Sequence, residues 1–450
     1  MSLRAYHLLS IGSLTTHFLS AQQVEKAERL EGHWAGNFIR QGNSAQSFTV
    51  DINASDSGLV ASLSITDWIG YEPTTSKVTI TADVARFDSP YGRISVVVDN
   101  EYGELVGACG FAQVHLKRTL ATACPEVLRQ THTFDLGDIR VPGSVVRPSG
   151  EGPFSTVILV QGRGCGTQAG WQRLPEEYAM RGLAVVTYDK RGGVGEARDC
   201  DRVTIAEHAA DLMRVVDQVK AIPGTGAVGL IAESAGGWAA YQAAAKRPGT
   251  IAFLITIAAP ATSVREQQSD CATYFVRDEL GLDDRCVQEA KRYTEMQFGT
   301  DRAQVFAELS TLLDSARAHG WIDVLDASDI PTSEASVDDL WVRRNGYDPT
   351  DDLRSFRGPF LSILGEQDNI VPWRENSARF NALFEANDTG HQEVIVLSAI
   401  GHGMEHGHRA RDLGFSVEMN AWSTYFKFDR VDPRPLERIF TFLKKNGFVQ

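Results

Sequence analysis

Ser234 is the residue whose surroundings most clearly predict chemistry. It follows the apolar run 228–232, where β-branched residues favour a strand, and it precedes residues 238–246, which favour a helix. The small residues Ala232 and Gly236 stand two positions to either side. A sharp turn between strand and helix strains the serine backbone, tolerates only small neighbours and lifts the hydroxyl clear of the sheet. The pattern predicts a nucleophile elbow, with a helix N-cap serine as the simpler alternative.

A base and an acid for this serine can be sought further along the chain. A serine hydroxyl barely ionises at neutral pH, so its attack on a carbonyl needs a histidine that takes the proton and an acid that orients the histidine. Asp368 stands just after the apolar strand expected at 360–364, and His402 stands on a loop after the strand expected at 394–397. The order Ser, Asp, His is typical of hydrolases with a nucleophile elbow. Ser234, Asp368 and His402 are therefore the predicted catalytic residues.

Glu366 and His391 are the nearest alternatives for the acid and the base. Glu366 comes two residues earlier than Asp368 and would leave the loop at a different angle. His391 precedes the last expected strand, so it is expected at the opposite end of the sheet. Neither residue is preferred for these reasons.

The negative charge that forms on an attacked carbonyl oxygen needs backbone N–H donors. The residue after the nucleophile, Ala235, is expected to supply one of them. The segment 160–166 follows an earlier expected strand, and its three glycines let the backbone approach a substrate closely. Gly162, Arg163 and Gly164 are its candidate oxyanion residues.

Two charged residues near the expected site are candidate substrate contacts. Arg163 could meet an anionic group of the substrate, although a salt bridge to a nearby carboxylate is the simpler interpretation. Glu233 directly precedes the nucleophile. The glycine-rich segment 189–195 lacks both the Gly-Lys-Thr ending and the GxGxxG spacing of phosphate loops, so nucleotide binding is not expected. A turn in which Asp189 pairs with Arg191 is the better interpretation of that segment.

Zinc is a weaker alternative for the histidine segment. Residues 402–406 match the HxxEH pattern, in which two histidines on one helix face bind zinc and the glutamate is the base. Gly401, Gly403 and Gly407 make a helix costly here, at about 1 kcal/mol each relative to alanine. No cysteine pair has the CxxC spacing of a zinc site. No metal or organic cofactor is therefore expected.

The chemistry-bearing residues fall in a part of the chain that predicts a layered α/β structure. Expected strands at 156–160, 184–188, 228–232, 251–257 and 360–364 alternate with helical stretches such as 205–221 and 373–384. Continuous apolar strands between helices indicate a mostly parallel sheet with helices on both faces, whose sites form at the carboxyl ends of the strands. Residues 263–352 interrupt this rhythm with polar, helix-compatible sequence. They predict a helical cap insertion over the site, or alternatively a decoration elsewhere.

The chain before residue 125 has a different pattern of apolar and polar residues. Residues 1–21 are expected to be a signal peptide, with a disordered terminus as the alternative. Residues 22–124 show short alternating segments between turns, which predict a small antiparallel β domain ahead of a catalytic domain at 125–450. Trp34 and Trp68 are expected to pack in its core or at its edge rather than to bind a ligand.

Composition narrows the partners and the compartment. A net charge of −14 without a basic stripe argues against nucleic acid and anionic membranes, and 43% hydrophobic with 23% charged residues is typical of a folded protein. Outside the terminus, no stretch reaches the roughly 18 apolar residues of a membrane span. The even number of cysteines could pair fully in a secreted protein, with neighbours along the chain as the suggested pairs and the connectivity left open. They are Cys109, Cys124, Cys165, Cys200, Cys271 and Cys286.

From about residue 138 to residue 450 the chain resembles the α/β-hydrolase superfamily, particularly bacterial two-domain serine esterases, and it is similar also to serine aminopeptidase-like hydrolases. The matching motifs are Gln161-Gly162, residues 188–193, residues 232–236, residues 365–368 and Gly401-His402. Ala232 stands where glycine is commoner, and Gln161 where a histidine is usual. The opening of the β domain, residues 32–36, is similar to the domain that precedes the hydrolase in some of these esterases.

The resemblance implies an α/β-hydrolase fold and hydrolysis of a small-molecule carboxylic ester through an acyl-enzyme, without a cofactor. A peptidase, an aminopeptidase or a thioesterase of the same fold is the alternative, since fold alone does not choose among them. A non-catalytic binding protein is a further alternative. The expected location is periplasmic or secreted, or cytoplasmic if the N-terminal segment is not a signal peptide. The natural substrate and the oligomeric state are left open.

Overall fold

The computed structural model divides by its internal contacts into two units, each described by itself. The described residues are 27–40, 43–66, 69–99, 103–110, 112–121, 125–193, 200–325, 327–340, 346–386, 390–404 and 432–450. Unit 1 comprises those up to residue 65 and from 73 to 121, and unit 2 comprises those from 66 to 72 and from 122 onward. The expected signal peptide, Trp68 and Cys124 lie outside the described residues.

Unit 1 is an antiparallel sheet, as its alternating pattern predicts. Among the described residues its strands lie in the order β4-β3-β2-β1-β9-β8-β7-β6-β5. Alternate residues of β3 are buried, and Trp34 of β1 is a core residue whose indole N–H donates to the Leu30 carbonyl at 2.8 Å. The strands are β1 Gly32–Arg40, β2 Asn43–Ser55, β3 Gly58–Ile65, β4 Thr74–Lys77, β5 Thr79–Thr81, β6 Val84–Ser89, β7 Gly92–Asp99, β8 Glu104–Cys109 and β9 Ala112–Thr119.

Unit 2 is built on a mixed, mostly parallel sheet of eight strands, β10-β11-β13-β12-β14-β15-β16-β17. The pairs β10–β11 and β11–β13 are antiparallel, and the remaining pairs are parallel. Every residue of β13, β15 and β16 is buried, which is why these strands are continuous apolar runs in the sequence. The strands are β10 Val127–Asp135, β11 Arg140–Pro148, β12 Phe154–Val160, β13 Ala184–Tyr188, β14 Thr225–Glu233, β15 Leu254–Ile257, β16 Phe360–Gly365 and β17 Gln392–Leu397.

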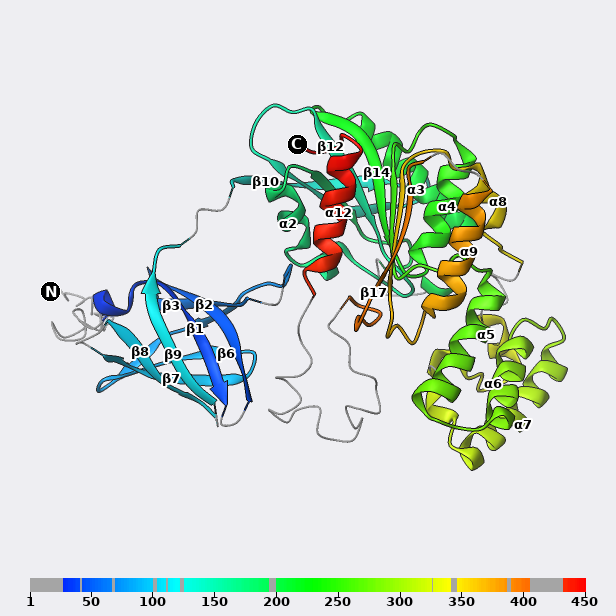
Figure 1. Ribbon diagram of the computed structural model, residues 1–450, viewed down its shortest axis with the longest axis horizontal. Helices are drawn as coiled ribbons and strands as arrows, with labels where there is room; N and C mark the ends of the chain where they lie inside the picture. Colours follow the sequence, from blue (N-terminus) through cyan, green and yellow to red (C-terminus); the bar gives the residue numbers. More distant parts are fainter. Residues whose placement is uncertain are drawn as a thin grey trace, which may run out of the picture. The chain divides into compact units, whose positions relative to one another are not determined.

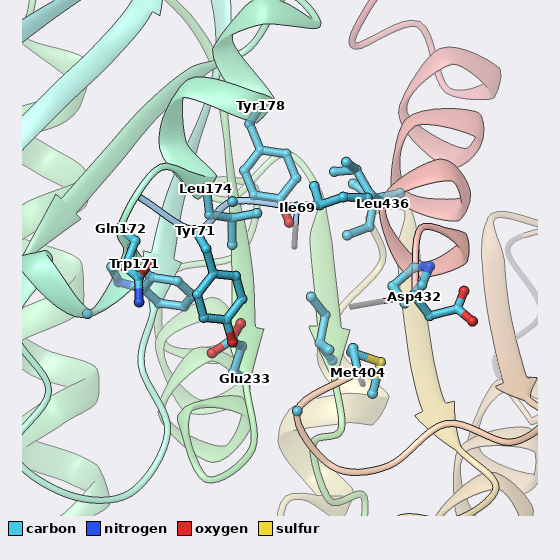
Figure 2. A pocket seen from close by; sticks show the side chains of 16 residues that line it. Ile69, Tyr71, Trp171, Gln172, Leu174, Tyr178, Glu233, Met404, Asp432 and Leu436 are labelled. Atoms are coloured by element: carbon cyan, nitrogen blue, oxygen red, sulfur yellow. The ribbon is translucent and has the colours of Figure 1, made fainter. Parts of the chain in front are cut away.

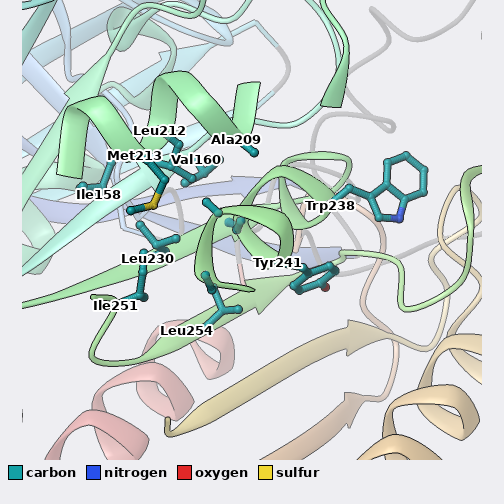
Figure 3. Packing of buried hydrophobic residues seen from close by; sticks show 14 of the residues in the cluster. Ile158, Val160, Ala209, Leu212, Met213, Leu230, Trp238, Tyr241, Ile251 and Leu254 are labelled. Carbon is teal, nitrogen blue, oxygen red and sulfur yellow. The ribbon is translucent and has the colours of Figure 1, made fainter. Parts of the chain in front are cut away.

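Helices cover both faces of this sheet (Figure 1). Successive strand residues point to opposite faces, so Leu230 and Ile231 of β14 enter different buried clusters. The first cluster, part of which Figure 3 shows, includes side chains of α3, α4, α8 and α9. The second includes Tyr178 of α2 and Leu436 of α12. The helices are α2 Leu174–Met180, α3 Ile205–Lys220, α4 Gly236–Lys246, α8 Thr350–Ser355, α9 Trp373–Glu385 and α12 Arg434–Lys445.

The sequence between β15 and β16 forms a helical subdomain with its own core. Helix α5 (Val264–Tyr274) starts at Ser263 with a capping box, in which the Ser263 hydroxyl accepts from the Glu266 N–H. Helices α6 (Asp284–Met296) and α7 (Arg302–His319) are capped by Asp283 and Asp301. Buried residues of these helices pack around Trp321 in a cluster separate from the two that flank the sheet. The insertion is therefore a folded body rather than a loop.

Candidate active site

Ser234 occupies a strained turn between β14 and α4. Its φ is +50°, in the left-handed region that non-glycine residues rarely adopt. Its N–H donates to the Ile257 carbonyl at 3.0 Å, which ties the turn to the end of the neighbouring strand β15. A Cβ on Gly236 would lie 2.6 Å from the Gln161 carbonyl oxygen, so only glycine fits there. Close backbone approach thus requires the glycine that stands two positions after the serine.

His402 and Asp368 form a hydrogen-bonded chain with Ser234. His402 Nε2 lies 3.1 Å from Ser234 Oγ, and His402 Nδ1 lies 2.8 and 3.0 Å from the two carboxylate oxygens of Asp368. With its proton on Nδ1, the imidazole donates to Asp368 and accepts from the serine hydroxyl. The Asp368 side chain is completely buried and also accepts from the N–H groups of Ile370 and Val371, both at 2.8 Å. These bonds keep the carboxylate aimed at the imidazole.

The alternatives weighed from the sequence lie elsewhere. Glu366 accepts from the Ala399 N–H at 3.3 Å. The carbonyl of His391 accepts from the N–H of Phe360, the first residue of β16, so His391 lies at the opposite end of the sheet from Asp368. His402 lies in a turn, not a helix, and Glu405 and His406 are outside the described residues. Among the residues that are described, no cluster of three His, Cys, Asp or Glu side chains could hold a metal ion.

The segment after β12 lies directly against the serine. A Cβ on Gly162 would be 3.0 Å from Ser234 Cβ. The buried ammonium of Lys190 donates to the Gly162 carbonyl at 2.7 Å and to the Gly164 carbonyl at 3.1 Å. In a planar trans peptide the C=O and the N–H of the next residue point in opposite directions. Because the Gly162 carbonyl points toward Lys190, the Arg163 N–H of the same peptide points away from Lys190. Ala235, the other predicted donor, stands at the N-terminus of α4, where N–H groups lack intrahelical partners.

Lys190 was not singled out by the sequence, and the pairing predicted beside it is wrong. Asp189 accepts from the Gln168 N–H at 2.7 Å instead of pairing with Arg191. Arg191 makes ion pairs at 2.7 Å with Asp138 and with Asp211. The signal available in the sequence was a lysine that stands two residues after the expected strand 184–188.

The side chain of Arg163 pairs with the helical insertion. Its guanidinium lies 2.8 Å from the carboxylate of Asp329, which was the simpler of the two interpretations of this residue. A second link to the insertion is the Cys271 thiol, which donates to the Asn369 carbonyl at 3.6 Å, one residue after Asp368. The insertion therefore contacts the segments that carry the candidate site.

A disulfide bond ties the segment after β12 to a later part of the chain. Cys165, which follows Gly164, is bonded to Cys200, 35 residues further along the chain. The expectation of full pairing is wrong for the other described cysteines, because Cys109, Cys271 and Cys286 are free. Burial, with the neighbouring carboxylates, raises the pKa of the Cys271 thiol to about 12, so this group stays protonated at neutral pH.

A cavity of about 220 Å³ is lined by Glu233, the residue before Ser234 (Figure 2), and by Gly403, the residue after His402. Its walls are largely apolar and aromatic, with Tyr71, Trp171 and Tyr178 among them. Burial raises the pKa of the Glu233 carboxyl to about 7, and His402 opposes this shift. A smaller cavity of about 30 Å³ is lined by the Gly162 segment and Ala235. Space for a bound molecule thus adjoins Ser234.

The mixed, mostly parallel sheet, the helices on its faces and the strained turn at Ser234 define the class of fold: unit 2 has the α/β-hydrolase fold. Residues 152–309 match the family model described as serine aminopeptidase, S33. No protein with a curated description matches the chain. Unit 1 is an antiparallel β domain that precedes this fold in the sequence.

Three solved structures show similarity. A Pyrococcus furiosus esterase has 15% identity over 71% of this chain and 91% of its own, with a TM-score of 0.40. Est1E from Butyrivibrio proteoclasticus, solved with ferulic acid, has 18% identity over 60% of this chain and 90% of its own, with a TM-score of 0.40. The α/β hydrolase GrgF from a Penicillium species has 16% identity over 71% of this chain and 99% of its own, with a TM-score of 0.42.

Within the described ranges, none of the helices combines the length and the apolar character that crossing a membrane requires.

Proposed function

We propose that the protein is a serine hydrolase that cleaves carboxylic esters of small molecules through an acyl-enzyme. The observation that carries this proposal is the hydrogen-bonded chain from the Ser234 hydroxyl through His402 to the buried carboxylate of Asp368. Such a chain lets the imidazole take the serine proton while the carboxylate stabilises the imidazolium that forms.

The reaction proceeds in two half-reactions. Ser234 Oγ attacks the ester carbonyl carbon as its proton passes to His402 Nε2, and the carbonyl oxygen becomes an oxyanion. The C–O bond to the alcohol then breaks, and His402 returns the proton to the departing alcohol oxygen. A water molecule attacks the acyl-enzyme in the same way, with His402 again taking a proton, and the acid leaves as the proton returns to Ser234.

The oxyanion is stabilised by backbone donors. The proposed groups are the Ala235 N–H, at the positive end of α4, and an N–H of the segment Gly162–Gly164. Supporting this assignment, Gly162 comes within contact distance of Ser234, and Lys190 fixes the carbonyl groups of that segment.

The test is hydrolysis of short p-nitrophenyl esters by the wild type and by Ser234→Ala. We expect kcat to fall by about 10⁴- to 10⁶-fold. The matched control is Ser355→Ala, since Ser355 is an exposed residue of α8 that donates to the Asp352 carbonyl. Equal rates for the wild type and Ser234→Ala would contradict the proposal.

A peptidase of the same fold is the second candidate, favoured by the description of the matching family model. Faster cleavage of aminoacyl arylamides than of the corresponding esters would select it, and faster cleavage of thioesters would select a thioesterase. Labelling of Ser234 by a fluorophosphonate, located by mass spectrometry, would count against a purely non-catalytic binding protein.

We propose an oxidising compartment, periplasmic or extracellular, on the strength of the Cys165–Cys200 disulfide. Intact mass spectrometry of the protein isolated from its own cells tests this. A Cys165–Cys200 pair found reduced there would argue for the cytoplasm.

A further inference from the structure

Glu233 is a carboxyl group that the proposed reaction does not use. It is the last residue of β14 and directly precedes Ser234. Its carboxyl group has no hydrogen-bond or ion-pair partner among the residues that the structure describes, and it lines the cavity beside the nucleophile (Figure 2). A carboxylate removed from water without a partner is unfavourable, as its raised pKa of about 7 reflects. A ligand that supplies positive charge would relieve this cost.

Glu233 is the acidic residue of the cavity whose carboxyl group can meet a positively charged ligand. Of the described residues that line it, none is Lys, Arg or His, and two are acidic. The second acidic residue, Asp432, is already held by the guanidinium of Arg434 at 2.8 Å. His402 faces Ser234 and Asp368 through its ring nitrogens. Glu233 therefore stands in an acidic cavity without a cation from the described lining.

Aromatic side chains complete the walls. Tyr71, Trp171 and Tyr178 line the same cavity as Glu233. Burial and the nearby charge of Glu233 both raise the pKa of Tyr178, so its phenol stays protonated and neutral. Rings of this kind attract cations through their faces, and several rings together with a carboxylate favour an alkylammonium group over a neutral one.

The wall that carries Tyr71 is a short segment, residues 69–72, that belongs to unit 2 by its contacts. The Gly70 carbonyl accepts from the Arg173 N–H at 2.7 Å, and the Glu72 N–H donates to Gln172 Oε1 at 3.0 Å. Gly70 has a φ of +85°, and a Cβ there would lie 3.2 Å from Leu174. Two hydrogen bonds and close packing thus fix Tyr71 beside the short helical turn that carries Trp171.

We propose that this cavity binds an alkylammonium group of the ester that Ser234 cleaves, with Glu233 as its counter-charge and the rings of Tyr71, Trp171 and Tyr178 as its walls. The inference rests on the proposed function and names its substrate class. Primary amines and quaternary ammonium groups share this chemistry. Glu233 is then a specificity-determining residue and not a member of the proton relay.

The test compares two esters that differ only in charge, one carrying a trimethylammonio group and one a tert-butyl group at the same position. Each pair is made with the group in the alcohol part and in the acyl part. For one of these placements we expect the wild type to show a kcat/KM that is roughly 10- to 100-fold higher for the cationic ester. A third member with a primary ammonium distinguishes the two kinds of cation.

The variant Glu233→Gln keeps the shape of the side chain and removes its charge. We expect it to bring the ratio of kcat/KM for the cationic ester to kcat/KM for the neutral ester near one. Tyr71→Ala should lower the ratio as well, and Tyr71→Phe should preserve it, because a ring face is kept. In the wild type the ratio should rise with pH through about 7, as Glu233 ionises.

The outcomes separate the two proposals. If the wild type cleaves cationic and neutral esters equally well, the cation site is refuted while the hydrolase stands. If it cleaves neither ester, the proposed function fails, and the site is then judged by calorimetry with tetramethylammonium. Heat of binding in the wild type that is lost in Glu233→Gln would support the site, and no heat in the wild type would refute it.

Discussion

Replacing Lys190 by methionine is expected to slow catalysis while the protein stays folded. The Lys190 ammonium is buried and holds the carbonyl oxygens of Gly162 and Gly164 at 2.7 and 3.1 Å. Methionine has a similar length but no donor, so both carbonyls lose a charge-assisted hydrogen bond. The peptide planes of this segment are then held less firmly, and so is the N–H proposed to donate to the oxyanion.

The size of the effect follows from what remains in place. Loss of one oxyanion donor lowers kcat by about 10²- to 10³-fold, which is an upper limit here. The Cys165–Cys200 disulfide and the Arg163–Asp329 ion pair still restrain the segment, so we expect a decrease of about 10- to 100-fold. Two carbonyls without a donor cost about 1–3 kcal/mol each, and removing a buried charge offsets part of this. The free energy of unfolding should fall by about 1–3 kcal/mol.

The assay measures kcat, KM and the affinity for a boronate inhibitor that mimics the tetrahedral intermediate. In Lys190→Met the boronate affinity should weaken together with kcat, while KM changes little, because the N–H that Lys190 positions is proposed to act only on the oxyanion. Lys220→Met, at the exposed end of α3, is the matched control and should behave as the wild type. If Lys190→Met keeps kcat within a factor of about two, the positioning role of Lys190 is refuted.

Two further predictions concern stability. Replacing Cys200 by serine opens a loop that the disulfide closes over a sequence separation of 35. The greater chain entropy of the unfolded state should lower the free energy of unfolding by about 4 kcal/mol. Urea unfolding under oxidising conditions measures this change, and an unchanged midpoint would contradict the prediction. The pKa of Glu233 rises from 4.5 to about 7 on folding, so the folded state holds more protons than the unfolded state between these values and loses stability as pH rises through them. Glu233→Gln lacks this loss, so its stability relative to the wild type should increase by about 3 kcal/mol from pH 4 to pH 8, and a difference independent of pH would show that the carboxyl group is not perturbed.

Local patterns in the sequence were sufficient to predict much of the fold. Continuous apolar strands predicted the parallel sheet of unit 2, because a strand buried on both faces has no polar alternate residues. Ser234, Asp368 and His402 each follow a strand, and parallel strands bring their carboxyl ends to one edge, where the structure has these three side chains in contact.

Features that depend on distant contacts were not predictable in this way. Tyr71 stands in a short connection between two strands of unit 1, and nothing in its local sequence indicates that it would lie beside Trp171, a hundred residues later. The reach of Lys190 to the Gly162 carbonyl depends on its rotamer rather than on spacing. The free thiols of Cys271 and Cys286 show a similar limit, since an even number of cysteines does not reveal which of them meet.

Glu233 and Ser234 are adjacent at the end of β14, and this adjacency restricts the distance between the proposed cation-binding carboxyl group and the proposed nucleophile. Consecutive Cα atoms are about 3.8 Å apart, and both residues belong to one hydrogen-bonded strand end, so the carboxyl group and the nucleophile cannot shift independently. A substrate whose charge is held by Glu233 must place its carbonyl carbon at Ser234 Oγ, which sets the number of bonds between the two groups. The protein would then select esters by the length of that spacer as well as by their charge.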